Sequence, residues 1–192
     1  MLLKIAAIAA IVYLDQLTKW LITTYLPESG KIIINGVLRL SYVENTGAAF
    51  GILSDCRWLF ISVSSIAILG MLWYLFFKKP GSRLLNLSLV LLAGGGIGNM
   101  IDRVLLGYVV DFIDFYAFPK IWLWVFNIAD VCITIGTALL ALYLITSTIA
   151  EARAGKVTAG SRKAMSDAAA ASQQPPKPQE DNENQKADSN PT

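Results

Sequence analysis

The chain has 192 residues, of which 55% are hydrophobic and 16% are charged. Soluble domains carry about a quarter charged residues, so this composition favours a single-domain membrane protein. The formal net charge of +2 is too small to indicate a nucleic-acid partner, and the absence of histidine excludes Ser–His triads, Cys–His pairs and HExxH zinc sites.

Four apolar segments are long enough to cross a bilayer, which takes about 20 residues in a helix. The first runs from about Leu2 to Leu26 and has no small-residue cleavage site near its end, so we expect a retained helix and not a signal peptide. The others run from Trp58 to Phe77, from about Leu84 to Leu106 and from about Ile121 to Ile149. The sequence therefore predicts an all-α integral membrane protein with four transmembrane helices.

The segment between the first two helices, Pro27 to Arg57, has β-rich flanks around Asn35-Gly36. An Asn-Gly pair between such flanks is typical of a β-hairpin. We therefore expect a small hairpin or sheet on the outer membrane surface.

Lysine and arginine beside the spans predict the orientation of the chain, because these residues are enriched in cytoplasmic loops. One side carries Lys4, Lys78, Lys79, Arg83, Arg153, Lys156, Arg162 and Lys163. The other carries Lys31, Arg39, Arg57 and Lys120. We expect both termini to be cytoplasmic.

The composition changes after Ala150, and Ala164 to Thr192 is rich in Ala, Gln, Pro, Asn, Asp and Lys. Such a segment buries too little apolar surface to offset the entropy of ordering. We expect residues 1–150 to form the transmembrane domain and residues 151–192 a disordered cytoplasmic tail.

Charged residues inside membrane spans need a partner or a function. Asp15 and Lys19 are four residues apart, so they share one face of the first helix in the order that favours an ion pair. A structural pair inside the bundle and a site-supporting role explain this spacing equally well.

The third helix carries a glycine-rich packing face followed by Asn99, Asp102 and Arg103, which project to a similar side. For Asp102 we favour a self-neutralising pair with Arg103. Arg103 is also suited to bind a substrate carbonyl or phosphate with its planar guanidinium.

Asp111 follows the third helix, and Asp130 shares a face of the fourth helix with Asn127. If that helix enters near Trp122, Asp130 lies about 12 Å deep, so the chain at Asp111 must fold back for the carboxylates to meet. Two carboxylates in one apolar pocket share a proton and can perform acid–base hydrolysis. Alternatively, Asp111 caps or solvates a helix end and Asp130 only pairs with Asn99 or Arg103.

Five short motifs occur in a fixed order along the predicted helices. They are Asp15-Gln-Leu-Thr-Lys19, Asn45-Thr-Gly-Ala-Ala-Phe-Gly51, Gly98-Asn99-Met-Ile-Asp102-Arg103, Val109-Val-Asp-Phe112 and Phe126-Asn-Ile-Ala-Asp130. Together they closely resemble the lipoprotein signal peptidases, also called signal peptidase II. The resemblance extends from about Leu2 to Ile149 and leaves out the tail.

The resemblance implies an aspartic endopeptidase of the bacterial cytoplasmic membrane, with its active site toward the outer face. It implies removal of signal peptides from diacylglyceryl-modified prolipoproteins, just before the lipidated cysteine, without a metal or organic cofactor. The positions that match the catalytic pair are Asp111 and Asp130. Those that match supporting and substrate-contacting residues are Asp15, Asn45, Asn99, Arg103 and Asn127. We expect a monomer that meets membrane lipid and is inhibited by globomycin-type cyclic peptides.

Three other functions compete with this interpretation. Intramembrane charges also mark ion pathways, although the chain has no inverted-repeat symmetry. A serine–lysine peptidase would use Lys19 as its base and Ser41, Ser54 or Ser62 as its nucleophile. In a non-enzymatic scaffold, the Asn and Asp residues would only hold the helices together.

Overall fold

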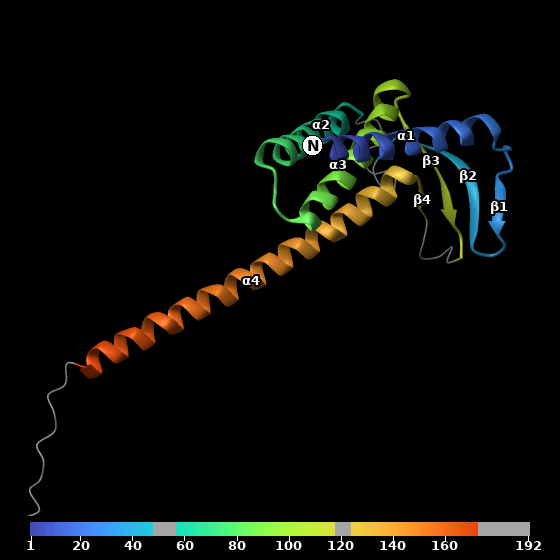
Figure 1. Cartoon of the computed structure of the whole chain (residues 1–192). Coiled ribbons are helices and arrows are strands. Elements are labelled where there is room, and N and C mark those ends of the chain that lie inside the picture. The colour runs from blue at the N-terminus through green and yellow to red at the C-terminus, as the bar shows by residue number, and fades with distance from the viewer. Residues whose placement is uncertain (48–56, 118–123, 173–192) are drawn as a thin grey trace, which may run out of the picture. The chain divides into compact units, whose positions relative to one another are not determined.

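The fold is that of a computed structural model, which describes residues 1–47, 57–117 and 124–172, with the side chains of 153–172 left out. The chain forms two compact units, Met1–Thr146 and Ser147–Thr192. The first unit contains a helical bundle and a small sheet (Figure 1).

All four predicted spans are helical. They are α1 (Leu2–Tyr25), α2 (Arg57–Trp73) with its π-helical continuation η2 (Tyr74–Lys78), α3 (Arg83–Leu105) and α4 (Ile128–Ser172). Each contains a stretch that is long and apolar enough to cross a membrane, with mean hydropathy between 1.5 and 2.2. The prediction of a membrane protein with four spans is confirmed.

The third helix, α3, is the most buried of the four spans. Its glycines allow close approach of two neighbours: a Cβ at Gly94 would lie 2.9 Å from the Ile11 side chain of α1, and one at Gly95 would lie 2.5 Å from the Ala129 carbonyl oxygen of α4. Any larger residue would push these helices away. The glycine-rich segment is therefore a packing face, as its sequence predicts.

The sheet has four antiparallel strands in the order β1-β2-β3-β4. Strands β1 (Lys31–Ile34) and β2 (Leu38–Asn45) form the predicted hairpin, and β3 (Val109–Phe115) and β4 (Val125–Phe126) extend it. Gly36 in the hairpin turn has a φ of +74°, a conformation that glycine adopts without strain. The hairpin is confirmed, and the sheet is larger than predicted.

The two strands that the sequence did not predict change the position of both aspartates. Helix α3 ends at Leu105, Gly107 turns the chain with a φ of +91°, and β3 runs back along β2, so Asp111 lies on a strand. Helix α4 begins at Ile128 instead of about Ile121. Asp130 therefore lies in the first helical turn, and the estimate that placed it about 12 Å into the helix is wrong.

The helix α4 continues to Ser172 and so includes residues 151–172 of the tail that was predicted to be disordered. Alanine recurs through residues 152–171 and proline first appears at Pro175, so this stretch favours a helix even though it is not apolar. Residues 173–192 of the predicted tail lie outside the described residues.

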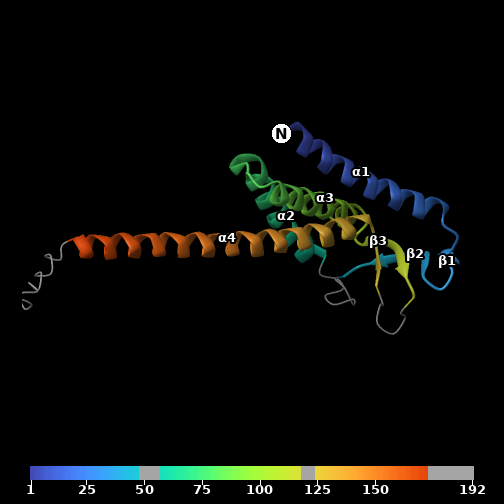
Figure 2. The same ribbon diagram turned by 60° about the horizontal axis from the view of Figure 1, so that its bottom comes forward.

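The two ends of the bundle differ. At one end, the Lys4 ammonium of α1 donates to the Leu75 carbonyl of η2 and to the Asn86 side chain of α3. The sheet lies at the opposite end, where α1 finishes and α4 starts (Figures 1 and 2). Polar residues from the sheet, α3 and α4 meet there.

Candidate active site

Asp111 is held on β3 by two amide groups. Its side chain is almost fully buried, with 2% of its surface exposed. One carboxylate oxygen accepts a hydrogen bond of 2.6 Å from the Asn127 amide, and the other accepts one of 2.9 Å from the Asn45 amide of β2. Both oxygens therefore have a fixed donor, which sets the plane of the carboxylate.

Asp130 is held by the start of α4. The Asn127 side-chain oxygen accepts from the Asp130 N–H at 2.9 Å, and the Asp130 carboxylate accepts from the Asn127 N–H at 3.2 Å. This reciprocal arrangement is a capping box, which satisfies backbone donors that a helix leaves unpaired. The second Asp130 oxygen accepts from the Asn99 amide at 2.7 Å. Local helix capping thus fixes the direction of this side chain.

Three asparagines, Asn45, Asn99 and Asn127, connect the two aspartates to the fold. Each has its side-chain oxygen occupied by a group that can only donate, so its NH₂ group is left to face a carboxylate. These donors are the Gly47 N–H, the Lys19 ammonium and the Asp130 N–H, respectively, and the Asn99 oxygen also accepts from the Asn127 NH₂ group. The amides therefore supply hydrogen bonds to both aspartates without adding charge.

A second cluster of charges lies beside this pair. The Lys19 ammonium is 2.8 Å from Asp15 and 2.8 Å from Asp102, and all three side chains are at most 4% exposed. The predicted Asp102–Arg103 pair is wrong, because consecutive residues on a helix do not face each other. Gln16 donates to Asp102 at 2.8 Å and completes the cluster.

Arg103 points away from that cluster, toward the aspartate pair. Its guanidinium donates to the Asn99 and Gly47 carbonyl oxygens at 3.4 and 3.5 Å, and it lies over the Phe60 ring at 5.1 Å. Among the described residues it forms no ion pair with a carboxylate within 4.0 Å. Its guanidinium is therefore a cation beside two acids, with donors left for a ligand.

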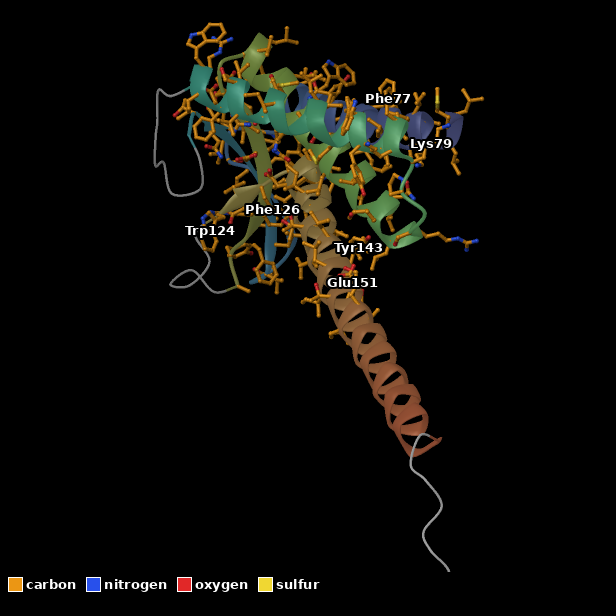
Figure 3. All side chains as sticks on the ribbon, turned by 90° about the vertical axis from the view of Figure 1, so that its left-hand side faces the viewer. Phe77, Lys79, Trp124, Phe126, Tyr143 and Glu151 are labelled. Atoms are coloured by element: carbon orange, nitrogen blue, oxygen red, sulfur yellow. The ribbon has the colours of Figure 1, made fainter. Side chains whose placement is uncertain are left out.

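A cavity of about 500 Å³ opens between the sheet and α4. Its polar wall contains Asn45, Arg103, Asp111, Asp130 and Thr134, and its apolar wall contains Trp124, Val125, Phe126, Val131 and Ile135. Figure 3 shows Trp124 and Phe126 at the β4 end of α4, with Tyr143 further along the helix. A ligand in this cavity would therefore contact both carboxylates and several apolar side chains.

The electrostatics of Asp111 fit this position. Burial raises the pKa of its carboxyl from 3.8 to about 6, and the nearby charge of Asp130 acts in the same direction. Hydrogen bonds from Asn45 and Asn127 and the charge of Lys19 oppose the rise in this pKa without cancelling it. The site therefore retains a proton at a pH where an isolated aspartate has lost it.

All seven residues that the sequence singled out lie in one network. Six of them surround the cavity or join its aspartates, and Asp15 lies in the neighbouring ion cluster. Sequence reasoning missed Asp102 and Gln16 as partners of that cluster. The one available signal was the helical spacing, which excludes the Asp102–Arg103 pair. Residues 48–51 of the Asn45–Gly51 motif lie outside the described residues.

A serine–lysine mechanism does not fit this geometry. The Lys19 ammonium is bound by two carboxylates and by Asn99, which uses all three of its protons. Ser41 donates to Asp114 at 3.4 Å, and Ser62 is exposed on α2. Ser54 lies outside the described residues. Lys19 therefore cannot act as the base for either described serine.

Comparisons with known proteins agree with the motifs. The family described as signal peptidase (SPase) II matches residues 7–146. The chain is 47% identical over 152 residues to a lipoprotein signal peptidase of Symbiobacterium thermophilum, covering 76% of this chain and 95% of that protein. It is 43% identical over 145 residues to a lipoprotein signal peptidase of Clostridioides difficile, covering 75% and 95%.

The fold is also similar to solved structures. A bacterial membrane enzyme determined by the in meso method at 2.3 Å resolution aligns with a TM-score of 0.70 and 33% identity, over 77% of this chain and 90% of that one. A second, at 1.9 Å resolution, aligns with a TM-score of 0.67 over 75% and 93%. The family match, over residues 7–146, includes every residue that lines the cavity.

Proposed function

This chain belongs to the signal peptidase II family and removes the signal peptides of prolipoproteins, and from this premise we propose that Asp111 and Asp130 are its catalytic pair. The observation that carries the proposal is that both carboxylates face one cavity and that, among the described residues, each of their oxygens is held by one donor. One lone pair on each oxygen remains for a water molecule or a shared proton.

In the proposed reaction, the ionised carboxylate takes a proton from water as the water oxygen attacks the scissile carbonyl carbon. The protonated carboxyl gives its proton to the carbonyl oxygen, which produces a neutral tetrahedral diol. When the diol collapses, one hydroxyl returns a proton to the second carboxylate. The C–N bond breaks as the amine nitrogen takes a proton from the first. The pair ends as it began, with one proton.

The polar and apolar walls of the cavity suggest how substrate binds. We propose that Arg103 donates to a substrate carbonyl next to the scissile bond, since its planar guanidinium offers fixed donors. The wall around Trp124 and Phe126 suits apolar side chains of the signal peptide or part of the lipid. A globomycin-type cyclic peptide would compete for the same cavity.

We propose that the sheet and the cavity lie at the outer face of the membrane and that residues 1–150 are sufficient for activity. The first part is supported by the positive charges where α1 begins, η2 ends and α3 begins, namely Lys4, Lys78, Lys79 and Arg83. The sheet lies at the opposite end of the bundle (Figure 1). Supporting the second, all seven site residues come from one unit of one chain, which also fits an active monomer.

The catalytic pair can be tested by substitution. We expect Asp111→Asn and Asp130→Asn to lower kcat at least about 1,000-fold, because each removes a group that must exchange protons in both steps. The measurement is the loss of the signal peptide from a diacylglyceryl-modified prolipoprotein, followed by gel mobility with the enzyme in detergent.

The matched control is Asp114→Asn, which removes a carboxylate from the same strand as Asp111. Asp114 pairs with Arg39 at 2.6 Å and does not line the cavity. This variant should cleave at close to the parent rate. Undiminished cleavage by a folded Asp111→Asn or Asp130→Asn enzyme would refute the aspartic mechanism.

A further inference from the structure

We propose that Asp15, Lys19 and Asp102, called here the ion triad, are positioning residues that fix the separation of the two catalytic carboxylates. The proposal rests on the function proposed above, in which both carboxylates must act on one peptide bond. It assigns a role in the reaction to Lys19 and Asp102, two residues outside the cavity wall.

The ion triad holds the backbone of the residue before each proposed catalytic aspartate. The Ala129 N–H, next to Asp130, donates to the Asp15 carboxylate at 2.9 Å. The Val110 N–H, next to Asp111, donates to the Asp102 carboxylate at 3.0 Å. Each catalytic aspartate thus follows a backbone group that a buried carboxylate holds in place.

One cation joins these two anchors. Lys19 lies 2.8 Å from both Asp15 and Asp102, so a chain of short contacts runs from Ala129 through the triad to Val110. The three side chains come from α1 and α3, whereas the anchored backbone belongs to α4 and β3. The triad therefore connects the two elements that carry the catalytic residues.

The third donor of Lys19 extends this control to an amide. Its ammonium donates to the Asn99 oxygen at 3.0 Å, which turns the Asn99 NH₂ group toward Asp130. The Asn127 NH₂ group donates to the same oxygen at 3.0 Å, so Lys19 and Asn127 together fix the orientation of the Asn99 amide. Lys19 therefore influences both the place and the hydrogen bonding of one catalytic carboxylate.

The triad is suited to positioning and not to chemistry. Every oxygen of Asp15 and Asp102 accepts at least one hydrogen bond or ion pair. None of the three residues lines the cavity. A misplacement of about 1 Å can cost about 100-fold in rate, so a small shift of either anchor would slow the chemical step and leave binding intact.

The test compares two substitutions of Asp102. Asp102→Leu removes the acceptor for the Val110 N–H and leaves Lys19 paired one to one with Asp15, so no charge is left uncompensated. We expect kcat to fall about 100-fold with KM within about threefold of the parent. Asp102→Asn keeps an oxygen for the Val110 N–H, and we expect it to restore kcat to within about tenfold of the parent.

Lys4→Met is the matched control, because Lys4 also joins α1 to its neighbours but at the opposite end of the bundle. It should keep the parent kcat. A folded Asp102→Leu enzyme with the parent kcat, or one whose loss of kcat is matched by Lys4→Met, would overturn the positioning role. So would a loss that appears only in KM.

Two further measurements keep the outcomes separate. In the parent enzyme, the backbone amides of Val110 and Ala129 should exchange slowly with solvent hydrogen, and fast exchange in the folded protein would overturn the proposal even if Asp102→Leu fails to fold. Asp130→Asn is assayed alongside. Full activity of Asp130→Asn would refute the catalytic pair itself, whereas loss of activity there and not in Asp102→Leu would refute only the triad.

Discussion

Two groups of buried acids lie side by side in this protein and differ in how their charge is compensated. In the ion triad, Asp15 and Asp102 share the ammonium of Lys19 at 2.8 Å each. In the proposed catalytic pair, the donors that Asp111 and Asp130 receive from the described part of the chain are all side-chain amides or backbone N–H groups. The side chains of the ion triad do not line the cavity, whereas those of Asp111 and Asp130 do.

We therefore expect different roles for the aspartates of the two groups, a structural role in the ion triad and a chemical role in the pair. A buried carboxylate that is paired with a cation and has a donor for each oxygen holds the groups that it contacts in place. A buried carboxylate with neutral donors and a like charge nearby holds a proton that it can give away. The substitutions below test whether the two groups respond as this contrast requires.

The largest expected effect on stability is that of Lys19→Met. It leaves Asp15 and Asp102 buried without a cation, and breaking a buried pair in this way costs about 3–5 kcal/mol. Denaturant unfolding in detergent micelles would measure the loss. Lys4→Met, which removes only hydrogen bonds to neutral groups, should cost much less. Equal losses of unfolding free energy in the two variants would mean that the triad stabilises the fold no more than Lys4 does.

The catalytic pair should respond to pH in the opposite sense from a salt-bridged acid. Since burial raises the pKa of Asp111 from 3.8 to about 6, the folded state binds its proton more tightly than the unfolded state does. The stability that Asp111 contributes is therefore fully present below about pH 4 and is lost as the pH rises to about 6. The loss amounts to at most about 3 kcal/mol, at about 1.4 kcal/mol for each pKa unit.

The check is the unfolding free energy of Asp111→Asn relative to the parent between pH 4 and pH 7. The variant lacks the titrating carboxyl, so its unfolding free energy should increase relative to that of the parent as the pH rises. Lys4→Met retains Asp111 and should follow the parent across this range. A constant difference between Asp111→Asn and the parent would show that the buried carboxyl carries no excess proton affinity.

Crowding the triad directly should have an intermediate effect. A Cβ at Gly98 would lie 2.6 Å from an Asp15 carboxylate oxygen that is already fixed by Lys19, so Gly98→Ala should cost about 1–3 kcal/mol and lower kcat. Two residues earlier, a Cβ at Gly96 would meet only the Ile68 side chain, at 3.2 Å. Gly96→Ala should be neutral or stabilising, because alanine favours the helix by up to about 1 kcal/mol. Thermal unfolding and cleavage assays of both variants would show whether the contrast holds.

Much of this arrangement could be predicted from the sequence, because some signals are local. Apolar runs of about 20 residues identify the spans, and Asn35-Gly36 identifies the hairpin. The motifs also named the aspartates that the fold brings to one cavity. The capping box of Asn127 and Asp130 was missed, because both residues were placed inside a helix that starts at about Ile121.

The features that were missed depend on distant parts of the chain. Val109–Phe115 follows the apolar third helix, and it forms a strand by pairing with β2, more than 60 residues earlier, and with β4. Likewise, Asp102 has an arginine next to it in sequence but finds its partner, Lys19, on another helix. A long-range partner is set by packing, which no local pattern records.

The smallest expected effect concerns a third kind of acid on the same strand as Asp111. Asp114 pairs with Arg39 at 2.6 Å, and the arginine side chain is 50% exposed. Solvent screens such a pair, so Asp114→Asn should change the unfolding free energy by less than about 1 kcal/mol. The loss should also shrink in high salt, because mobile ions screen exposed charges. A cost as large as that of Lys19→Met, or one that salt leaves unchanged, would mean that exposure does not distinguish the acids of this strand. The differences between the carboxylates of the ion triad, of the proposed catalytic pair and of the salt-bridged Asp114 would then need another physical explanation.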